Sequence, residues 1–244
     1  MQSPGLGALF TNSHVVVEET HLLAEVEPLF AEEAALVARA VPGRQREFAV
    51  GRHCAHRALA RIGVPAGPLL ASPDRAPRWP EGIVGSITHT RAGAAGFCAA
   101  AVAERRRVAA LGIDAESAEP LPRSLWHQVL DPEEARGLER EPAGVHLAKV
   151  IFSAKEATYK ALSSGVGKVL DFADVHIHLL APRGAFVAEL RFPEAPALVP
   201  GARCEGRFAT AGDLVLTAVA LPAMRQPTFP CQVHIAVPSA IFGK

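Results

Sequence analysis

Two acids at the end of an apolar segment are the clearest candidates for metal chemistry. Asp114 and Glu116 follow the segment Leu111-Gly112-Ile113, which has the composition of a β-strand. Because side chains alternate along a strand, acids two residues apart lie on one face. Two oxygen ligands on a rigid element suit Mg²⁺, which proteins hold with one or two carboxylates, several waters and substrate phosphates. On this tripeptide alone, a pair of solvated acids where a strand leaves its sheet is the commoner arrangement.

A lysine-rich segment offers a third carboxylate next to positive charge. Glu156 and Lys160 lie four residues apart in a predicted helix, so they share a face. They form either an exposed ion pair, or a metal ligand beside an ammonium group that meets a phosphate. Lysine is scarce in this chain, with five lysines against twenty arginines, yet Lys149, Lys155 and Lys160 fall within twelve residues. This clustering mildly favours the phosphate interpretation.

A predicted strand over residues 83–88 ends in polar side chains. Ser86 and Thr88 lie on one face of this strand, and His89 lies where it meets a turn. Hydroxyls and an imidazole at a strand end can contact phosphate oxygens closely. A histidine near a turn that bonds only to backbone is the alternative, and for a lone histidine it is the commoner one.

Five arginines and one acid, Glu47, lie in a predicted helix over residues 44–62. The arginines are Arg44, Arg46, Arg52, Arg57 and Arg61. Arginine forks match phosphate geometry, so this helix is a candidate anion clamp, with a solvated face as the alternative. The sequence contains no Walker loop, no G-x-G-x-x-G after a strand and no G-x-S-x-G, so it does not favour a P-loop, a dinucleotide-binding fold or a serine hydrolase.

The order of elements predicts an α+β fold of two similar halves joined near residues 112–120. In the first half, helices over 29–37 and 44–62 precede an antiparallel meander of strands over 83–88, 94–102 and 108–113. In the second half, helical stretches near 123–140 and 145–163 precede a meander of strands over 172–179, 185–192, 204–209 and 214–221.

Composition narrows the class of protein further. The chain has 244 residues, of which 49% are hydrophobic, enough for a sizeable core. Its 25 basic and 25 acidic residues cancel, so we expect no long-range attraction to nucleic acid or to an anionic membrane. No apolar stretch is long enough to span a bilayer and no secretory signal is recognisable. Four scattered cysteines without a C-x-x-C pair predict a reduced, cytoplasmic protein.

Four segments in order carry a family resemblance. They are R-x-x-x-x-x-x-x-R-H-C-A at 44–55, R-A-P-R-W-P-E-G-I-V-G-S-I-T-H at 75–89, G-I-D-A-E at 112–116 and F-S-A-K-E-A-T-Y-K-A at 152–161. Together they resemble the 4′-phosphopantetheinyl transferases, and specifically their large, pseudo-dimeric branch, to which enterobactin synthase component D and the surfactin-type enzymes belong. The match runs from about residue 44 to residue 162, and the predicted strand over 214–221 also fits.

The resemblance implies an enzyme that moves 4′-phosphopantetheine from coenzyme A to a serine of an acyl or peptidyl carrier protein, releasing adenosine 3′,5′-bisphosphate. It implies that Asp114, Glu116 and Glu156 hold Mg²⁺, with Mn²⁺ as a possible substitute. Lys160 would neutralise charge on the pyrophosphate, and Glu156 is our hypothesis for the base that takes the serine proton. Asp114, Glu156 and Lys160 are therefore the expected catalytic residues.

The same resemblance assigns the contacts to coenzyme A. Ser86 and His89 would touch the phosphates, Arg44 and Arg52 would grip the 3′-phosphate, Lys155 would lie near the pyrophosphate, and the loop around Arg75–Trp79 would border the adenine. The acids Glu33 and Glu47 receive no role.

The implied fold has two subdomains related by pseudo-two-fold symmetry, each a small antiparallel sheet packed with helices, and coenzyme A in the cleft between them. We expect an N-terminal half over residues 1–113, a C-terminal half over 114–221 and an extended tail over 222–244. We also expect a monomer that serves polyketide or nonribosomal peptide synthesis. A Mg²⁺-dependent phosphohydrolase of nucleotides or coenzyme A and a non-catalytic module that binds carrier proteins are the alternatives.

Overall fold

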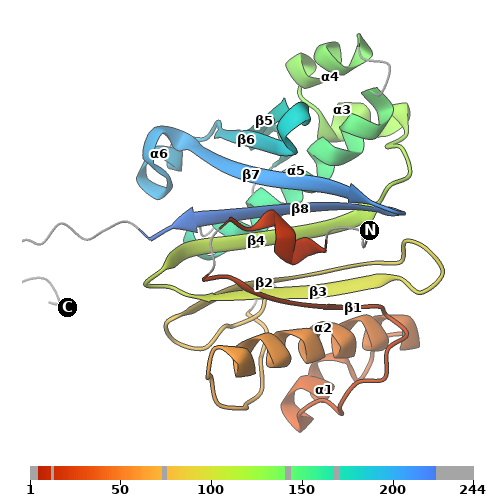
Figure 1. Ribbon diagram of the computed structural model, residues 1–244, viewed down its shortest axis with the longest axis vertical. Helices are drawn as coiled ribbons and strands as arrows, with labels where there is room; N and C mark the ends of the chain where they lie inside the picture. Colours follow the sequence, from red (N-terminus) through yellow and green to blue (C-terminus); the bar gives the residue numbers. More distant parts are fainter. Residues whose placement is uncertain (1–4, 12–13, 73–75, 141–143, 167–170, 224–244) are drawn as a thin grey trace, which may run out of the picture.

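Two antiparallel sheets lie side by side in the computed structural model (Figure 1), which describes residues 5–11, 14–72, 76–140, 144–166 and 171–223. The smaller sheet has three strands and the larger has five. One long helix packs on each sheet: α2 (Pro42–Arg61) on the first and α5 (Gly144–Val166) on the second. The expected α+β class with two subdomains is therefore confirmed.

The N-terminal half is built around the middle strand of the smaller sheet. Its strands are β1 (Val16–Thr20), β2 (Ile83–Thr90) and β3 (Phe97–Glu104), in the order β1-β3-β2. The short helix α1 (Ala31–Val37) precedes α2. Proline at the first position of α2 suits a helix start because its missing N–H would have no partner there. Buried residues of α2 and β3, including Cys54 and Cys98, form the core between helix and sheet.

The C-terminal half uses the larger sheet, in the order β4-β8-β7-β6-β5. Its strands are β4 (Val108–Ser117), β5 (Val175–Leu180), β6 (Ala185–Leu190), β7 (Arg203–Ala211) and β8 (Leu214–Pro222). Helix α5 crosses this sheet against β4 and β8, and the short helices are α3 (Trp126–Val129), α4 (Pro132–Glu139) and α6 (Ala195–Leu198). None of the helices in the described ranges is long and apolar enough to cross a bilayer.

Two sequence predictions about the elements are wrong. The expected meander of the first half does not form, because β3 already has β1 and β2 on its two edges and leaves none for β4. Instead, β4 pairs with β8, about a hundred residues further along the chain. The single helical stretch expected near 123–140 is broken, because the Asp131 carboxylate accepts hydrogen bonds from the first turn of α4 and starts a new helix at Pro132. The predicted division at residues 113–114 stays a prediction; both residues lie in β4, a strand of the larger sheet.

Hydroxyl groups join the two sheets where β2 lies beside β4 (Figure 1). Ser86 Oγ accepts a hydrogen bond from the Ile113 N–H at 3.2 Å, and Thr88 Oγ1 accepts one from the Ala115 N–H at 3.0 Å. Side chains of one sheet thus take the place of the backbone carbonyls that a continuous sheet would supply. This junction fixes the end of β2 next to the acidic end of β4.

Candidate active site

Asp114 lies at the point where β2, β4 and α5 meet. Its Oδ1 accepts from Lys160 Nζ at 2.6 Å and from Thr88 Oγ1 at 3.3 Å, and its Oδ2 accepts from Ser153 Oγ at 2.8 Å. The Asp114 residue is only 3% exposed. A buried carboxylate requires such partners, since burying an unpaired charge is costly. The structure thus brings together two of the three expected catalytic residues, Asp114 and Lys160.

Close packing of α5 on β4 sets this geometry. A Cβ atom added to Gly112 would lie 1.9 Å from the Ala157 carbonyl oxygen and 2.6 Å from the Ala161 nitrogen. Only glycine lets the helix approach the strand this closely. With the helix in place, Lys149 Nζ also comes to 3.7 Å from Glu116 Oε2, so the helix presents basic groups to both acids of β4.

The third expected metal ligand, Glu156, lies on α5 within electrostatic range of the acids of β4. Burial raises the pKa of the Glu156 carboxyl, and Asp114 adds to the rise while Lys160 opposes it. Burial also raises the pKa of Glu116, with Asp114 and Glu156 adding to the rise. Three carboxyl groups, Asp114, Glu116 and Glu156, thus interact electrostatically in this part of the structure with Lys149 and Lys160. Asp114, Glu116 and Glu156 carry the oxygen ligands that a hard divalent cation prefers, although their oxygens do not all lie within 4.8 Å of one another in this structure.

A second charged cluster continues from the end of β2 to α2. The Arg44 Nη1 atom lies 3.0 Å from His89 Nε2, and Glu47 accepts from Arg44 at 3.4 Å and from Arg91 at 2.8 Å. Burial lowers the pKa of the His89 ring, as do Arg44, Lys160 and Arg91, whereas Glu47 opposes the shift. His89 thus lies between the basic groups of α2 and the Asp114–Lys160 pair. Glu47, which received no role from the sequence, is the counter-charge of this cluster.

Arg52 lies deeper than Arg44. It is 5% exposed, its Nε donates to the Leu69 carbonyl at 2.9 Å, and that Nε lies 3.9 Å from Glu33. Burial lowers the pKa of the Arg52 guanidinium, while Glu33 opposes the shift and Arg44 reinforces it. Arg44 and Arg52 both lie on α2, eight residues apart, and their shared contact with the 3′-phosphate stays a prediction. Glu33 is fully buried and also accepts from the Leu69 N–H and from His56 at 2.8 Å each, so it anchors this region.

The expectation that Lys155 contacts coenzyme A is wrong on geometric grounds. Lys155 is fully buried, and its ammonium donates to Glu134 at 2.8 Å, to the Val129 carbonyl at 2.9 Å and to the Phe172 carbonyl at 3.0 Å. An ammonium group has three N–H donors, and these three bonds use them all. Lys155 therefore ties α5 to its neighbours within the C-terminal half.

Two further predicted contacts with coenzyme A stay predictions. Ser86 is 4% exposed, and its hydroxyl oxygen serves the junction between the sheets. Arg75 lies outside the described residues. Trp79, from the same loop, packs against Gly85 of β2, where a Cβ atom would lie 2.6 Å from the indole ring.

A different group of residues has the closest spacing of candidate metal ligands. Among the described residues, Asp131, Glu134 and His176 form the single set whose candidate ligand atoms all lie within 4.8 Å of one another. Its members already have protein partners: Glu134 accepts from Lys155 and from the Ile177 N–H at 2.7 Å, and Asp131 accepts from His176. A cation would have to compete with the buried ammonium of Lys155. We therefore assign this set to holding α4, α5 and β5 together.

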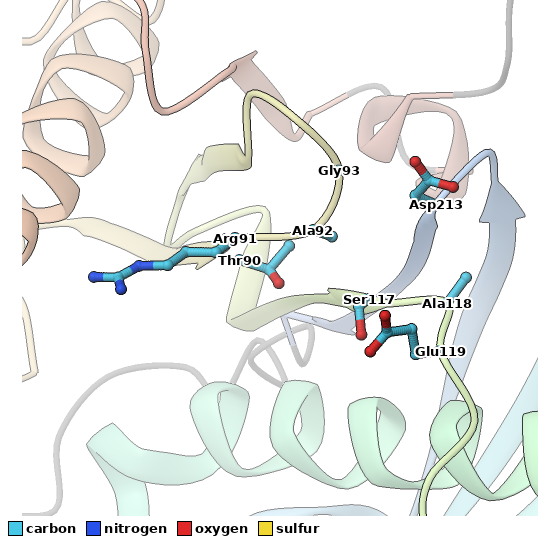
Figure 2. Close-up of a pocket in the computed structure, with 8 residues that line it drawn as sticks. All are labelled: Thr90, Arg91, Ala92, Gly93, Ser117, Ala118, Glu119 and Asp213. Atoms are coloured by element: carbon cyan, nitrogen blue, oxygen red, sulfur yellow. The ribbon is translucent and has the colours of Figure 1, made fainter.

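A cavity of about 780 Å³ opens beyond the ends of β2 and β4. It is lined by residues 90–93 at the end of β2, by residues 117–119 at the end of β4, and by Asp213 in the β7–β8 turn. Figure 2 shows the Arg91 side chain pointing away from Glu119 and Asp213, in keeping with its bond to Glu47. The cavity continues the strands that carry His89 and Glu116, so it lies next to the acidic and basic clusters.

Comparisons with known proteins agree with the two-part architecture. A family model described as the 4′-phosphopantetheinyl transferase N-terminal domain matches residues 32–103, and one described as the 4′-phosphopantetheinyl transferase superfamily matches residues 110–200. The two matched ranges meet at the turn between β3 and β4, where the chain passes from one sheet to the other.

Several curated relatives are similar over most of the chain. The 4′-phosphopantetheinyl transferase Svp of Streptomyces mobaraensis is 45% identical over 204 residues, covering 81% of this chain and 80% of the relative. The 4′-phosphopantetheinyl transferase PptT of Mycobacterium tuberculosis is 38% identical over 196 residues, covering 78% and 85%. Enterobactin synthase component D of Salmonella typhi is 34% identical over 158 residues, covering 60% and 64%.

Proposed function

Because this chain belongs to the 4′-phosphopantetheinyl transferase superfamily, we propose that the cluster around Asp114 is the centre at which it transfers 4′-phosphopantetheine, with Mg²⁺ held by Asp114, Glu116 and Glu156. The chain is a coenzyme A-dependent transferase that acts on carrier proteins. In this reaction the serine oxygen of the carrier forms a bond to the phosphorus next to pantetheine. The bond from that phosphorus to the bridging oxygen breaks, and adenosine 3′,5′-bisphosphate leaves.

The main observation in support of the proposal is that acidic side chains of β4 lie next to an acid and a lysine of α5. Lys160 donates to Asp114 at 2.6 Å, while Glu116 and Glu156 contribute two further carboxyls whose pKa values burial raises. When bound, Mg²⁺ would neutralise negative charge that develops on the pyrophosphate oxygens. The three carboxylates supply the oxygen ligands that it prefers.

The remaining charged groups would bind and orient the donor. Lys160 would add its positive charge to the pyrophosphate, and His89 and Arg44, 3.0 Å apart, would contact phosphate oxygens. Arg52 would bind the 3′-phosphate through its terminal nitrogens, since its Nε is bonded to Leu69. Ser86 and the loop that contains Arg75 keep their proposed contacts with phosphate and adenine. Positioning the donor in this way is a large part of catalysis, because it converts an encounter into an intramolecular step.

Glu156 is the proposed base. Its carboxylate would take the proton of the carrier serine, directly or through a water molecule. Burial raises the pKa of this carboxyl, which brings its proton affinity closer to that needed by a base at neutral pH. A Glu156→Gln variant that kept normal turnover would exclude this role.

We propose carrier proteins of polyketide or nonribosomal peptide synthesis, and the similarity to enterobactin synthase component D supports this choice. We propose a monomer, because β2, β4 and α5 of one chain supply the whole cluster around Asp114. We propose a cytoplasmic location, because the cysteines are scattered and Cys54, Cys98 and Cys204 are free and buried. Mn²⁺ would substitute for Mg²⁺.

Intact-mass spectrometry of apo carrier proteins tests the function. Incubation with the enzyme, coenzyme A and Mg²⁺ should add one phosphopantetheine to a peptidyl or polyketide carrier. A chelator and the Asp114→Ala variant should both abolish the addition. Consumption of coenzyme A without modification of any carrier would instead indicate a phosphohydrolase.

A further inference from the structure

A chain of two hydroxyl groups holds the second oxygen of the Asp114 carboxylate. Ser153 Oγ of α5 lies 2.8 Å from Asp114 Oδ2 and 2.9 Å from Thr217 Oγ1 of β8. Thr217 stands directly opposite Asp114 in the ladder between β4 and β8. Ser153 and Thr217 are both fully buried. The three side chains come from three different elements. Ser153 lies within the F-S-A-K-E segment, but the sequence analysis gave a role only to Asp114.

The number of available protons determines which group donates in each of these hydrogen bonds. An ionised carboxylate only accepts hydrogen bonds, so the single O–H of Ser153 is donated to Asp114. The O–H of Thr217 can then go only to Ser153, either to its Oγ or to its backbone carbonyl at 3.0 Å. Thr217 therefore acts on Asp114 through Ser153, with no direct bond of its own to the carboxylate among the described contacts.

We infer that Ser153 and Thr217 are positioning residues that fix the orientation of the Asp114 carboxylate toward its metal, an inference that rests on the proposed function. The other oxygen, Oδ1, already receives Lys160 and Thr88. With Oδ2 held by Ser153 as well, the carboxylate plane cannot rotate without breaking a buried hydrogen bond. Groups that hold a metal ligand in place commonly change metal affinity when they are removed.

A nearby threonine shows that a buried hydroxyl on this helix can bond within the helix instead. The Thr158 hydroxyl donates to the Ala154 carbonyl at 2.7 Å, one turn back in the same helix, as helical serine and threonine often do. Ser153 instead directs its hydroxyl out of α5 toward β4. Thr158 is also fully buried. It is therefore a matched control: a buried hydroxyl on the same helix with no bond to Asp114.

The test measures Mn²⁺ binding by electron paramagnetic resonance, with coenzyme A present and no carrier protein. Ser153→Ala should weaken Mn²⁺ binding by about 10- to 100-fold, and Thr217→Val by about 10-fold. Thr158→Val should leave it unchanged. The Ser153→Ala/Thr217→Val double variant should bind no more weakly than Ser153→Ala, because Thr217 acts through Ser153. Thr217→Ser keeps the hydroxyl and should restore binding.

The remaining outcomes would contradict either the positioning role or the metal assignment. If both hydroxyl variants bind Mn²⁺ like the wild type and lose only thermal stability, the result expected for Thr158→Val, the positioning role is wrong. If Asp114→Asn weakens binding while the hydroxyl variants do not, this inference fails and the proposed function stands. If Asp114→Asn also binds normally, the metal assignment itself fails. Thr217→Val nearly preserves side-chain shape, so it decides the question even if Ser153→Ala does not fold.

Discussion

The ammonium of Lys160 lies 2.6 Å from Oδ1 of Asp114, although the two residues are 46 positions apart and belong to α5 and β4. This contact couples the acidic end of the strand to the helix that carries Glu156. It also explains how a charge that is nearly buried is tolerated, since an ionic partner and two hydroxyl donors surround it.

Removing the Lys160 charge should therefore cost transfer activity. Lys160→Gln should lower kcat/KM by about 100- to 1000-fold, the usual loss when one charge-stabilising group is removed. Stopped-assay mass spectrometry of a carrier protein measures this. Arg57→Gln is the control, because Arg57 pairs with Glu18 on the exposed side of α2 and should be replaceable at no cost. Equal activity of the two variants would contradict the role of Lys160.

The close approach of α5 to β4 gives a second prediction. Gly112→Ala places a Cβ atom 1.9 Å from the Ala157 carbonyl oxygen, so the helix must move. We expect a loss of about 1–3 kcal/mol in the free energy of unfolding, typical of overpacking. Transfer should fall as well, because Ser153 and Lys160 move with the helix. Gly137→Ala in α4 meets no atom within 4 Å and should not destabilise the protein. Urea unfolding distinguishes the two variants, and similar midpoints would refute the packing argument.

The buried position of Lys155 predicts a stability defect without a binding defect. Lys155→Met removes one partner of the buried Glu134 carboxylate, and breaking a buried pair costs about 3–5 kcal/mol. The folded fraction of this variant should retain the wild-type KM for coenzyme A. Thermal unfolding and initial-rate kinetics test the two statements separately. A raised KM in a fully stable variant would restore Lys155 as a ligand of coenzyme A.

The acids of the site should make metal binding depend on pH. Burial raises the pKa values of Glu116 and Glu156, and a metal ligand must be deprotonated. Mn²⁺ affinity should thus be full above these raised pKa values and fall as pH drops through them. The folding stability of the metal-free protein should depend on pH in the opposite direction. Because the pKa values of these two carboxyls are raised in the folded state, the folded state binds more protons than the unfolded state in this range. The free energy of unfolding should therefore fall as pH rises.

Mn²⁺ titrations and chelated unfolding experiments over a pH series measure the two effects. Glu116→Gln should flatten both dependences. A Mn²⁺ affinity that did not change with pH would show that these carboxyls are not the ligands.

Local pattern placed the candidate residues on shared faces but did not assign the site. Asp114 and Glu116 share a strand face and Glu156 and Lys160 share a helix face, while the family resemblance supplied their proposed roles. Lys155 was misplaced although a signal existed: it lies on the same face of α5 as Ile151 and Leu162, which are buried. A lysine among apolar neighbours indicates a buried partner, here Glu134.

The pairing of strands that are distant in the sequence could not be predicted from local sequence patterns. The short strand β1 occupies the edge of β3 that β4 was expected to take, and nothing near β4 reveals this. The contact of Thr217 with Ser153 depends on the register of β4 with β8, which places Thr217 opposite Asp114 across more than a hundred residues of chain. Glu47 similarly gained its role only when folding brought Arg91 beside Arg44.

The most direct test of the metal site is anomalous diffraction from crystals soaked in Mn²⁺ and coenzyme A. Two clusters compete for the ion, the three carboxylates Asp114, Glu116 and Glu156, and the set Asp131, Glu134 and His176. We predict a single anomalous peak bounded by Asp114, Glu116 and Glu156. A peak at Asp131, Glu134 and His176, with none beside Asp114, would contradict the account.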